Sequence, residues 1–123
     1  VKLLGQNDNI LQIMNGLDIY VQSSSYGEGF PNVVAESMAC GTPCIVTDVG
    51  DASFIVGKTG WVVPPNSPNK LAKVIEEVIN QIGNKNWKKR GDLVRSRMKE
   101  NFDISKMIIS YNKLWYEVYK KNN

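Results

Sequence analysis

The stretch "DIYVQSSSYGEGFPNVVAESMACGTPCIVT", residues 18–47, decides the fold. A short β-branched run at 18–22 precedes a loop rich in serine and glycine, and a second such run at 43–47 follows a segment of helix length. Two strands joined through a helix form a βαβ unit, in which the strands are parallel. The sequence therefore predicts an α/β fold, a Rossmann-like parallel sheet with flanking helices.

Further short apolar runs extend this pattern on both sides. "KLLG" at 2–5 and "GWVVP" at 60–64 predict strands, and Asp8 is a predicted N-cap for a helix over 9–17. Parallel sheets bind ligands where the strands end and the following loops converge. The loop 23–30, which directly follows a predicted strand, is therefore the expected ligand site.

From Pro68 onward the chain shows only helical patterns. Apolar side chains from 71 to 82 share one helix face, and Gly83 provides a stop. A second helix is predicted over about 86–100, and a third begins with Asp103 as its N-cap. The third helix carries a wide apolar stripe, so we expect it to pack against something substantial. The stripe consists of Ile104, Met107, Ile108, Tyr111, Leu114, Trp115, Val118 and Tyr119.

Length and composition restrict the class of protein. With 123 residues the chain holds one domain at most. No apolar run approaches the roughly 18 residues that cross a bilayer, and the first residues lack the features of a signal peptide. A cytoplasmic location is expected. Cys40 and Cys44 occur without any histidine, so they are expected to be buried thiols and not metal ligands.

The charge is unevenly distributed along the chain. Residues 1–79 carry four lysines against eight acids, whereas residues 80–123 carry eleven basic residues against four acids. The run "NKNWKKRGDLVRSRMK" at 84–99 contains Trp87 and could lie on an anionic membrane at the cytoplasmic face. A solvated, charged helix face is the favoured reading of this run, and no nucleic-acid partner is expected.

The loop before the predicted helix has the features of a phosphate site. Glycines allow the backbone to approach a ligand closely, and Pro31 suits the first turn of a helix. The amides that follow, including those of Asn32 and Val33, would point out of the helix N-terminus, where anions bind. Glu28 would repel a phosphate, so its natural partners are hydroxyl groups.

Glu36 lies about one and a half helical turns further on, among small residues. Its carboxylate suits the vicinal hydroxyls of a ribose. These residues together predict a sugar nucleotide as ligand. An equally weighted alternative is that Glu28 is a solvated loop residue and Glu36 occupies an exposed helix position.

A family resemblance supports the first alternative. The run "SSSYGEGFPNVVAESMACGTPCIVTDVG", residues 23–50, resembles the nucleotide-sugar site of family 4 retaining glycosyltransferases of the GT-B fold. Glu28 and Glu36 match the two acids of that family's E-x7-E signature. "GKTGWVVPPNSPNKLAKVIEEVI" at 57–79 is similar to the family's turn and following helix, so the resemblance covers nearly the whole chain.

The resemblance implies roles for individual residues. Glu28, the expected catalytic residue, would contact hydroxyls of the donor sugar, and Glu36 would hold the ribose. The base would sit near Leu4 and Gly5. The remaining donor-binding positions, with amides facing sugar and phosphate and the helix N-terminus at Pro31, are Gly29, Phe30, Pro31, Asn32 and Val33. No cofactor and no metal are implied beyond the nucleoside diphosphate sugar.

The resemblance also indicates what lies outside this chain. The family's Arg/Lys pair for the diphosphate and its N-terminal acceptor domain are absent, so residues 1–123 match part of the C-terminal, donor-binding domain. The parent enzyme would transfer a hexose or N-acetylhexosamine to a glycan or lipid-linked acceptor, in cell-surface polysaccharide synthesis. The isolated fragment is expected to be inactive and prone to self-association. The alternative is a non-catalytic nucleotide-binding or interaction module.

Overall fold

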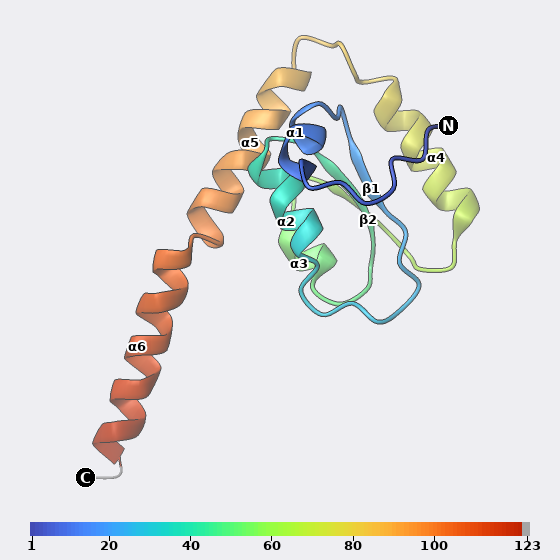
Figure 1. The fold of residues 1–123 in the computed structure, drawn as a ribbon. Coiled ribbons are helices and arrows are strands. Elements are labelled where there is room, and N and C mark those ends of the chain that lie inside the picture. Colours follow the sequence, from blue (N-terminus) through green and yellow to red (C-terminus); the bar gives the residue numbers. More distant parts are fainter. Residues whose placement is uncertain (122–123) are drawn as a thin grey trace.

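A computed structural model describes residues 1–121. A three-stranded parallel sheet forms the centre of the molecule (Figure 1). The strands are β1 (Tyr20–Gln22), β2 (Cys44–Thr47) and β3 (Trp61–Val63), in the spatial order β1-β2-β3. Tyr20 pairs with Cys44, and Ile45 pairs with Trp61. The predicted α/β fold with a Rossmann-like parallel sheet is confirmed.

Helices precede, connect and follow the strands. They are α1 (Ile10–Asn15), α2 (Asn32–Ala39), α3 (Ala52–Val56), α4 (Pro68–Ile79), α5 (Trp87–Asn101) and α6 (Ile104–Lys121). Figure 1 shows α4 on the opposite side of the sheet from α5. Helices α2, α3 and α5 share one core with β2.

The core is built around β2, whose four residues are all buried. Successive side chains of a strand point to opposite faces. Cys44 and Val46 therefore enter the cluster formed with α2, α3 and α5, whereas Ile45 faces the other side. A strand that is buried on both faces reads as a continuous apolar run, which is the pattern that the sequence shows here.

Two arginines fasten α5 across the ends of neighbouring helices. Arg95 donates hydrogen bonds to the carbonyl oxygens of Ala39 (3.2 Å) and Cys40 (2.7 Å), at the end of α2. Arg97 donates to Ile55 in α3 (2.7 Å). A cation at a helix C-terminus satisfies carbonyls that have no partner within the helix and also complements the helix dipole. Part of the basic run therefore has a structural role.

The predicted strand at 2–5 is wrong. This segment contains no strand, and Leu3 and Leu4 are exposed. A strand needs a neighbouring strand to satisfy its backbone hydrogen-bonding groups. β1 lies at the edge of the sheet, and in the described part of the chain residues 2–5 do not pair with its outer side.

Several predicted helix boundaries also need correction. Asn9, not Asp8, is the N-cap of α1, and its amide is bound by the side-chain oxygen Oδ1 of Asn7 (2.8 Å). Pro31 is the N-cap of α2 and not part of its first turn. Helix α4 ends at Ile79, so Gly83, with a φ of +85°, turns the following loop and does not stop the helix.

Helix α6 begins as expected and then departs from the expectation. The carboxylate of Asp103 accepts a hydrogen bond from the amide of Ser105 (2.8 Å), and this bond is the first cause of the lowered pKa of Asp103. None of the residues of α6 is buried, and Figure 1 shows the helix extending away from the rest of the molecule. Within residues 1–121 the stripe residues from Ile104 to Val118 are exposed, so no large surface of the described chain packs against them.

The two cysteines and Trp61 are buried to different extents. Cys44 is fully buried, as expected, and burial raises the pKa of its thiol to about 12, whereas Cys40 is only half-buried. Trp61 is half-buried and stacks on Trp87 with ring centroids 6.4 Å apart.

Ile55 tests how strongly the β2 core contributes to stability. Ile55→Ala removes a fully buried side chain and is expected to lower the free energy of unfolding by about 2–5 kcal/mol. Ile109→Ala makes the same chemical change at an exposed position of α6 and should stay within about 0.5 kcal/mol of the parent. Urea denaturation measures both, and equal losses would contradict the placement of the core.

Candidate functional site

Two loops meet at the carboxyl end of the sheet. The loop 23–30 leaves β1 and enters α2, and the loop 48–51 leaves β2 and enters α3. The amide of Asp51 donates a hydrogen bond to the carbonyl oxygen of Gly29 (2.9 Å), which ties the two loops together. The backbone of the expected ligand loop is therefore fixed at Gly29 by the neighbouring loop.

Gly50 makes this contact possible. Its φ is +57°, and a Cβ atom at this position would collide with the carbonyl oxygens of Gly29 and Glu28. Only glycine combines the left-handed conformation with such a close approach of two backbones. In the sequence, the position of Gly50 shortly after a predicted strand is the signal that could have identified this contact.

Glu28 is half-buried and is held by a hydroxyl group. The Oγ atom of Ser24 donates to Oε1 of Glu28 over 2.6 Å. Thr47, at the end of β2, in turn donates from its hydroxyl to the carbonyl oxygen of Ser24 (2.6 Å). In the described residues, Oε2 of Glu28 accepts no hydrogen bond from the protein. One carboxylate oxygen is thus fixed while the other remains available.

Gln22 supplies a further polar group beneath Ser24. Its Nε2 atom lies 3.4 Å from the Ser24 hydroxyl, and its own Oε1 atom is buried without a hydrogen-bond partner. A buried polar atom without a partner is unusual and marks a site where another group is expected. Sequence reasoning missed Gln22, Ser24 and Thr47 as a connected set, because the contact of Thr47 with Ser24 spans 23 positions in the chain.

The N-terminus of α2 presents unpaired donors, as the sequence suggested. The amides of Val34 and Ala35 both bind the carbonyl oxygen of Pro31 (3.0 and 3.4 Å). The amides that were expected to face a ligand donate no hydrogen bond within residues 1–121, and they belong to Gly29, Phe30, Asn32 and Val33. Free amides at a helix N-terminus attract anions.

Glu36 is exposed on α2 and borders a groove of about 490 Å³ between α2 and α5. Phe30 and Lys99 also line this groove. Burial raises the pKa of the Tyr20 hydroxyl, and negative charge on Cys44, Glu28 and Glu36 raises it further. Both acids thus contribute to the raised pKa of the same β1 residue.

Phe30 has a structural environment of its own. Its ring packs against Phe102 with centroids 5.8 Å apart, and Phe102 also meets Phe54 at 5.6 Å. This contact joins the ligand loop to the junction between α5 and α6. The side chain of Phe30 thus orients the loop, and its backbone amide stays available.

The predicted base-binding residues lie in the irregular segment before α1. Leu4 is 52% exposed, and Gly5 has a φ of +65°. In the described part of the chain, neither residue forms a hydrogen bond with the loop 23–30. Their assignment stays a prediction that the geometry does not strengthen.

Comparison with known proteins gives a consistent set of relatives. The family model described as "Glycosyl transferases group 1" matches residues 1–81. N-acetyl-alpha-D-glucosaminyl L-malate synthase of Bacillus anthracis is 29% identical over 121 residues, which cover 96% of this chain and 31% of that protein. An uncharacterized glycosyltransferase of Methanocaldococcus jannaschii is 31% identical over 122 residues, covering 96% and 34%.

A solved structure shows the same relationship in three dimensions. Sucrose-phosphate synthase from Thermosynechococcus elongatus superposes with a TM-score of 0.75 and 28% sequence identity, over 89% of this chain and 27% of that one. The chain therefore spans about a third of the length of these curated relatives.

Gly50 tests whether the contact between the two loops is as close as described. Gly50→Ala and Gly83→Ala both place a Cβ at a positive φ, which costs roughly 1–2 kcal/mol. Only the change at Gly50 adds a collision with the backbone of Glu28 and Gly29, and overpacking typically costs a further ~1–3 kcal/mol. Thermal and urea unfolding should show the larger loss for Gly50→Ala, and equal losses would contradict the contact.

Proposed function

This chain belongs to the glycosyl transferases group 1 family, and on that premise we propose that it forms the donor-binding part of a retaining glycosyltransferase. One observation carries the proposal. The unpaired amides at the start of α2 lie directly after Glu28, whose Oε1 atom is held by Ser24 while Oε2 is available. This arrangement offers donors for a diphosphate beside an acceptor for sugar hydroxyls.

The proposed substrate is a nucleoside diphosphate sugar that carries a hexose or N-acetylhexosamine. The amides of Gly29, Phe30, Asn32 and Val33 would bind sugar and phosphate oxygens, and Glu36 would accept hydrogen bonds from the ribose hydroxyls. Negative charge develops on the departing diphosphate, and preorganised N–H donors stabilise such charge without reorganisation. Glu28 would orient the sugar through Oε2 and would not act as a nucleophile.

We propose that the rest of the catalytic site lies in a longer polypeptide. Residues 1–123 would form part of a C-terminal donor domain, and an acceptor domain would bind a glycan or lipid-linked acceptor in cell-surface polysaccharide synthesis. The relatives are about three times as long as this chain, which supports such an arrangement. The Arg/Lys pair for the diphosphate would also come from outside these residues. That no metal and no further cofactor take part stays a prediction.

An alternative function is a non-catalytic nucleotide-binding or interaction module. The exposed apolar stripe of α6 favours an interaction, since such a stripe on an isolated helix is normally covered by a partner. Nucleotide binding without transfer by the complete polypeptide would support this alternative over the enzyme.

The two acids provide the direct test of the enzymatic proposal. In the complete polypeptide, Glu28→Gln and Glu36→Ala are each expected to reduce transfer from a defined donor by about ten-fold or more, because each removes a charged hydrogen-bond acceptor for the donor. Glu76→Gln and Glu77→Ala remove exposed acids from α4 and serve as matched controls. Turnover at the parent rate in both site variants would exclude these roles.

We also propose a peripheral contact with anionic membrane at the cytoplasmic face, as a separate point. Within residues 1–121, no helix has the length and apolar character needed to span a bilayer. Arg95 and Arg97 bind helix carbonyls, so the exposed lysines of the basic run are the cations that could meet lipid, and these are Lys85, Lys88, Lys89 and Lys99. Self-association through α6 likewise stays a prediction.

Liposome flotation tests the membrane contact. The chain is expected to float with vesicles that contain phosphatidylserine and to lose part of this binding in the double variant Lys88→Gln/Lys89→Gln, because each basic residue near the surface contributes about 1 kcal/mol. Lys70→Gln/Lys73→Gln on α4 removes the same charge elsewhere. Equal flotation with neutral vesicles would contradict an electrostatic contact.

A further inference from the structure

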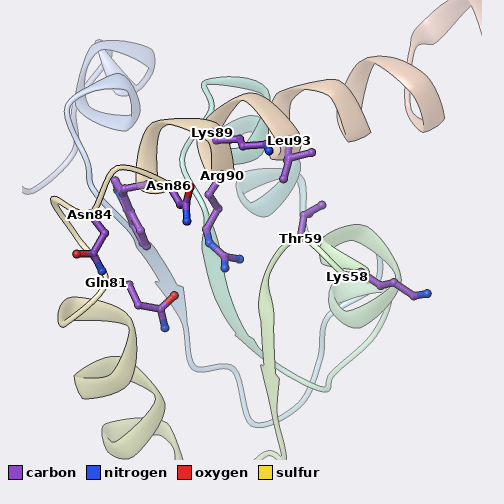
Figure 2. A pocket seen from close by; sticks show the side chains of 9 residues that line it. Lys58, Thr59, Gln81, Asn84, Asn86, Lys89, Arg90 and Leu93 are labelled. Carbon is purple, nitrogen blue, oxygen red and sulfur yellow. The ribbon is translucent and has the colours of Figure 1, made fainter.

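A second cavity lies at the other end of the sheet from the candidate donor site (Figure 2). It has a volume of about 400 Å³ and is lined by Lys58, by the loop between α4 and α5, and by the first turns of α5. Lys58 and Thr59 lie in the turn before β3, so the cavity is at the amino ends of the parallel strands. The loops 23–30 and 48–51 follow the carboxyl ends, and none of their residues lines this cavity.

The lining is cationic and contains no carboxylate. Lys58, Lys89 and Arg90 contribute positive charge, and Asn84 and Asn86 contribute side-chain amides. Figure 2 shows the guanidinium of Arg90 and the side chain of Gln81 directed into the same space. A concave site that is lined by cations and side-chain amides and contains no acid favours an anionic ligand.

Arg90 differs from the other arginines of α5 in having no acceptor. Arg95 and Arg97 bind backbone carbonyls at the ends of neighbouring helices. Across residues 1–121, the guanidinium of Arg90 forms neither a hydrogen bond nor an ion pair, and it rests over the ring of Trp61 at 4.5 Å from its centroid. Trp61 is itself stacked on Trp87. The aromatic rings thus hold the guanidinium in place while its N–H donors stay unused.

We propose that this cavity binds a phosphate monoester, with Arg90 as the bidentate ligand of the phosphate. The planar guanidinium matches two phosphate oxygens, and the amides of Asn84 and Asn86 add uncharged donors. A volume of about 400 Å³ falls in the range of small-molecule sites and exceeds a bare phosphate, so Trp87 and Leu93 would contact the group attached to it. The proposal does not depend on the function of the donor site.

Phosphate binding is tested with this chain and soluble probes. Inorganic phosphate and glycerol 3-phosphate are titrated at constant ionic strength, and the indole N–H signals of Trp61 and Trp87 are followed by NMR. Saturable shifts are expected, with tighter binding of glycerol 3-phosphate. Arg90→Gln should weaken binding by about ten-fold or more, because a charge-assisted bidentate contact is lost.

Two further variants separate a specific contact from general attraction. Arg90→Lys keeps the charge and removes the planar fork, so it should bind more weakly than the parent. Lys99→Gln removes a charge from α5 outside this cavity and should leave the affinity within about two-fold, since exposed charges are screened by salt. The absence of saturable binding, or equal weakening by Arg90→Gln and Lys99→Gln in folded variants, would overturn the proposal.

The source of the phosphate is distinguished with vesicles. Phosphatidic acid carries a phosphate monoester, whereas phosphatidylserine carries negative charge with a phosphodiester. A preference for phosphatidic acid that Arg90→Gln abolishes would identify a lipid headgroup as the ligand. Binding of glycerol 3-phosphate without such a preference would identify a soluble phosphate. Vesicle binding that is independent of both headgroup and Arg90, without binding of the soluble probes, would overturn the site.

Discussion

The burial of β2 on both faces is the constraint on which the rest of the structure depends. A central parallel strand needs helices on each side, and here α2, α3 and α5 enclose one face while Ile45 is buried on the other. Because all three strands run in one direction, their carboxyl ends lie at one end of the sheet and their amino ends lie at the other. The candidate donor site is at the carboxyl end, and the cationic cavity is at the amino end.

Local patterns in the sequence were sufficient to predict β2 and the strand, loop and helix that precede it. Strand, glycine-rich loop and helix follow one another within residues 18–47, so neighbouring signals reinforce one another. The strand expected at 2–5 failed for the opposite reason. Its apolar residues suit a strand, but a strand forms only by pairing with another, and the pattern alone does not show that this segment stays unpaired beside the open edge of β1 in residues 1–121.

The candidate site was predictable in its residue types and not in its contacts. Glycine, proline and acid spacing indicated free amides and two carboxylates, and within residues 1–121 the amides of Asn32 and Val33 donate no hydrogen bond. The groups that orient Glu28 come from different strands. Ser24 follows β1 and Thr47 ends β2, and only the register of the sheet places them together. The close approach at Gly50 likewise depends on how two loops meet.

The basic run of α5 shows why net charge alone is a weak guide to function. Its cations looked equivalent in the sequence, yet the side chains of Arg95 and Arg97 donate their hydrogen bonds to backbone carbonyls at the ends of α2 and α3. Arg90 lies on the same helix but reaches a tryptophan ring, where the guanidinium is held without an acceptor. A cation that satisfies a helix end contributes to the fold, whereas an equally charged group that is fixed and unpaired in a cavity has its hydrogen-bonding capacity left for a ligand. The distinction lies in what each side chain already binds.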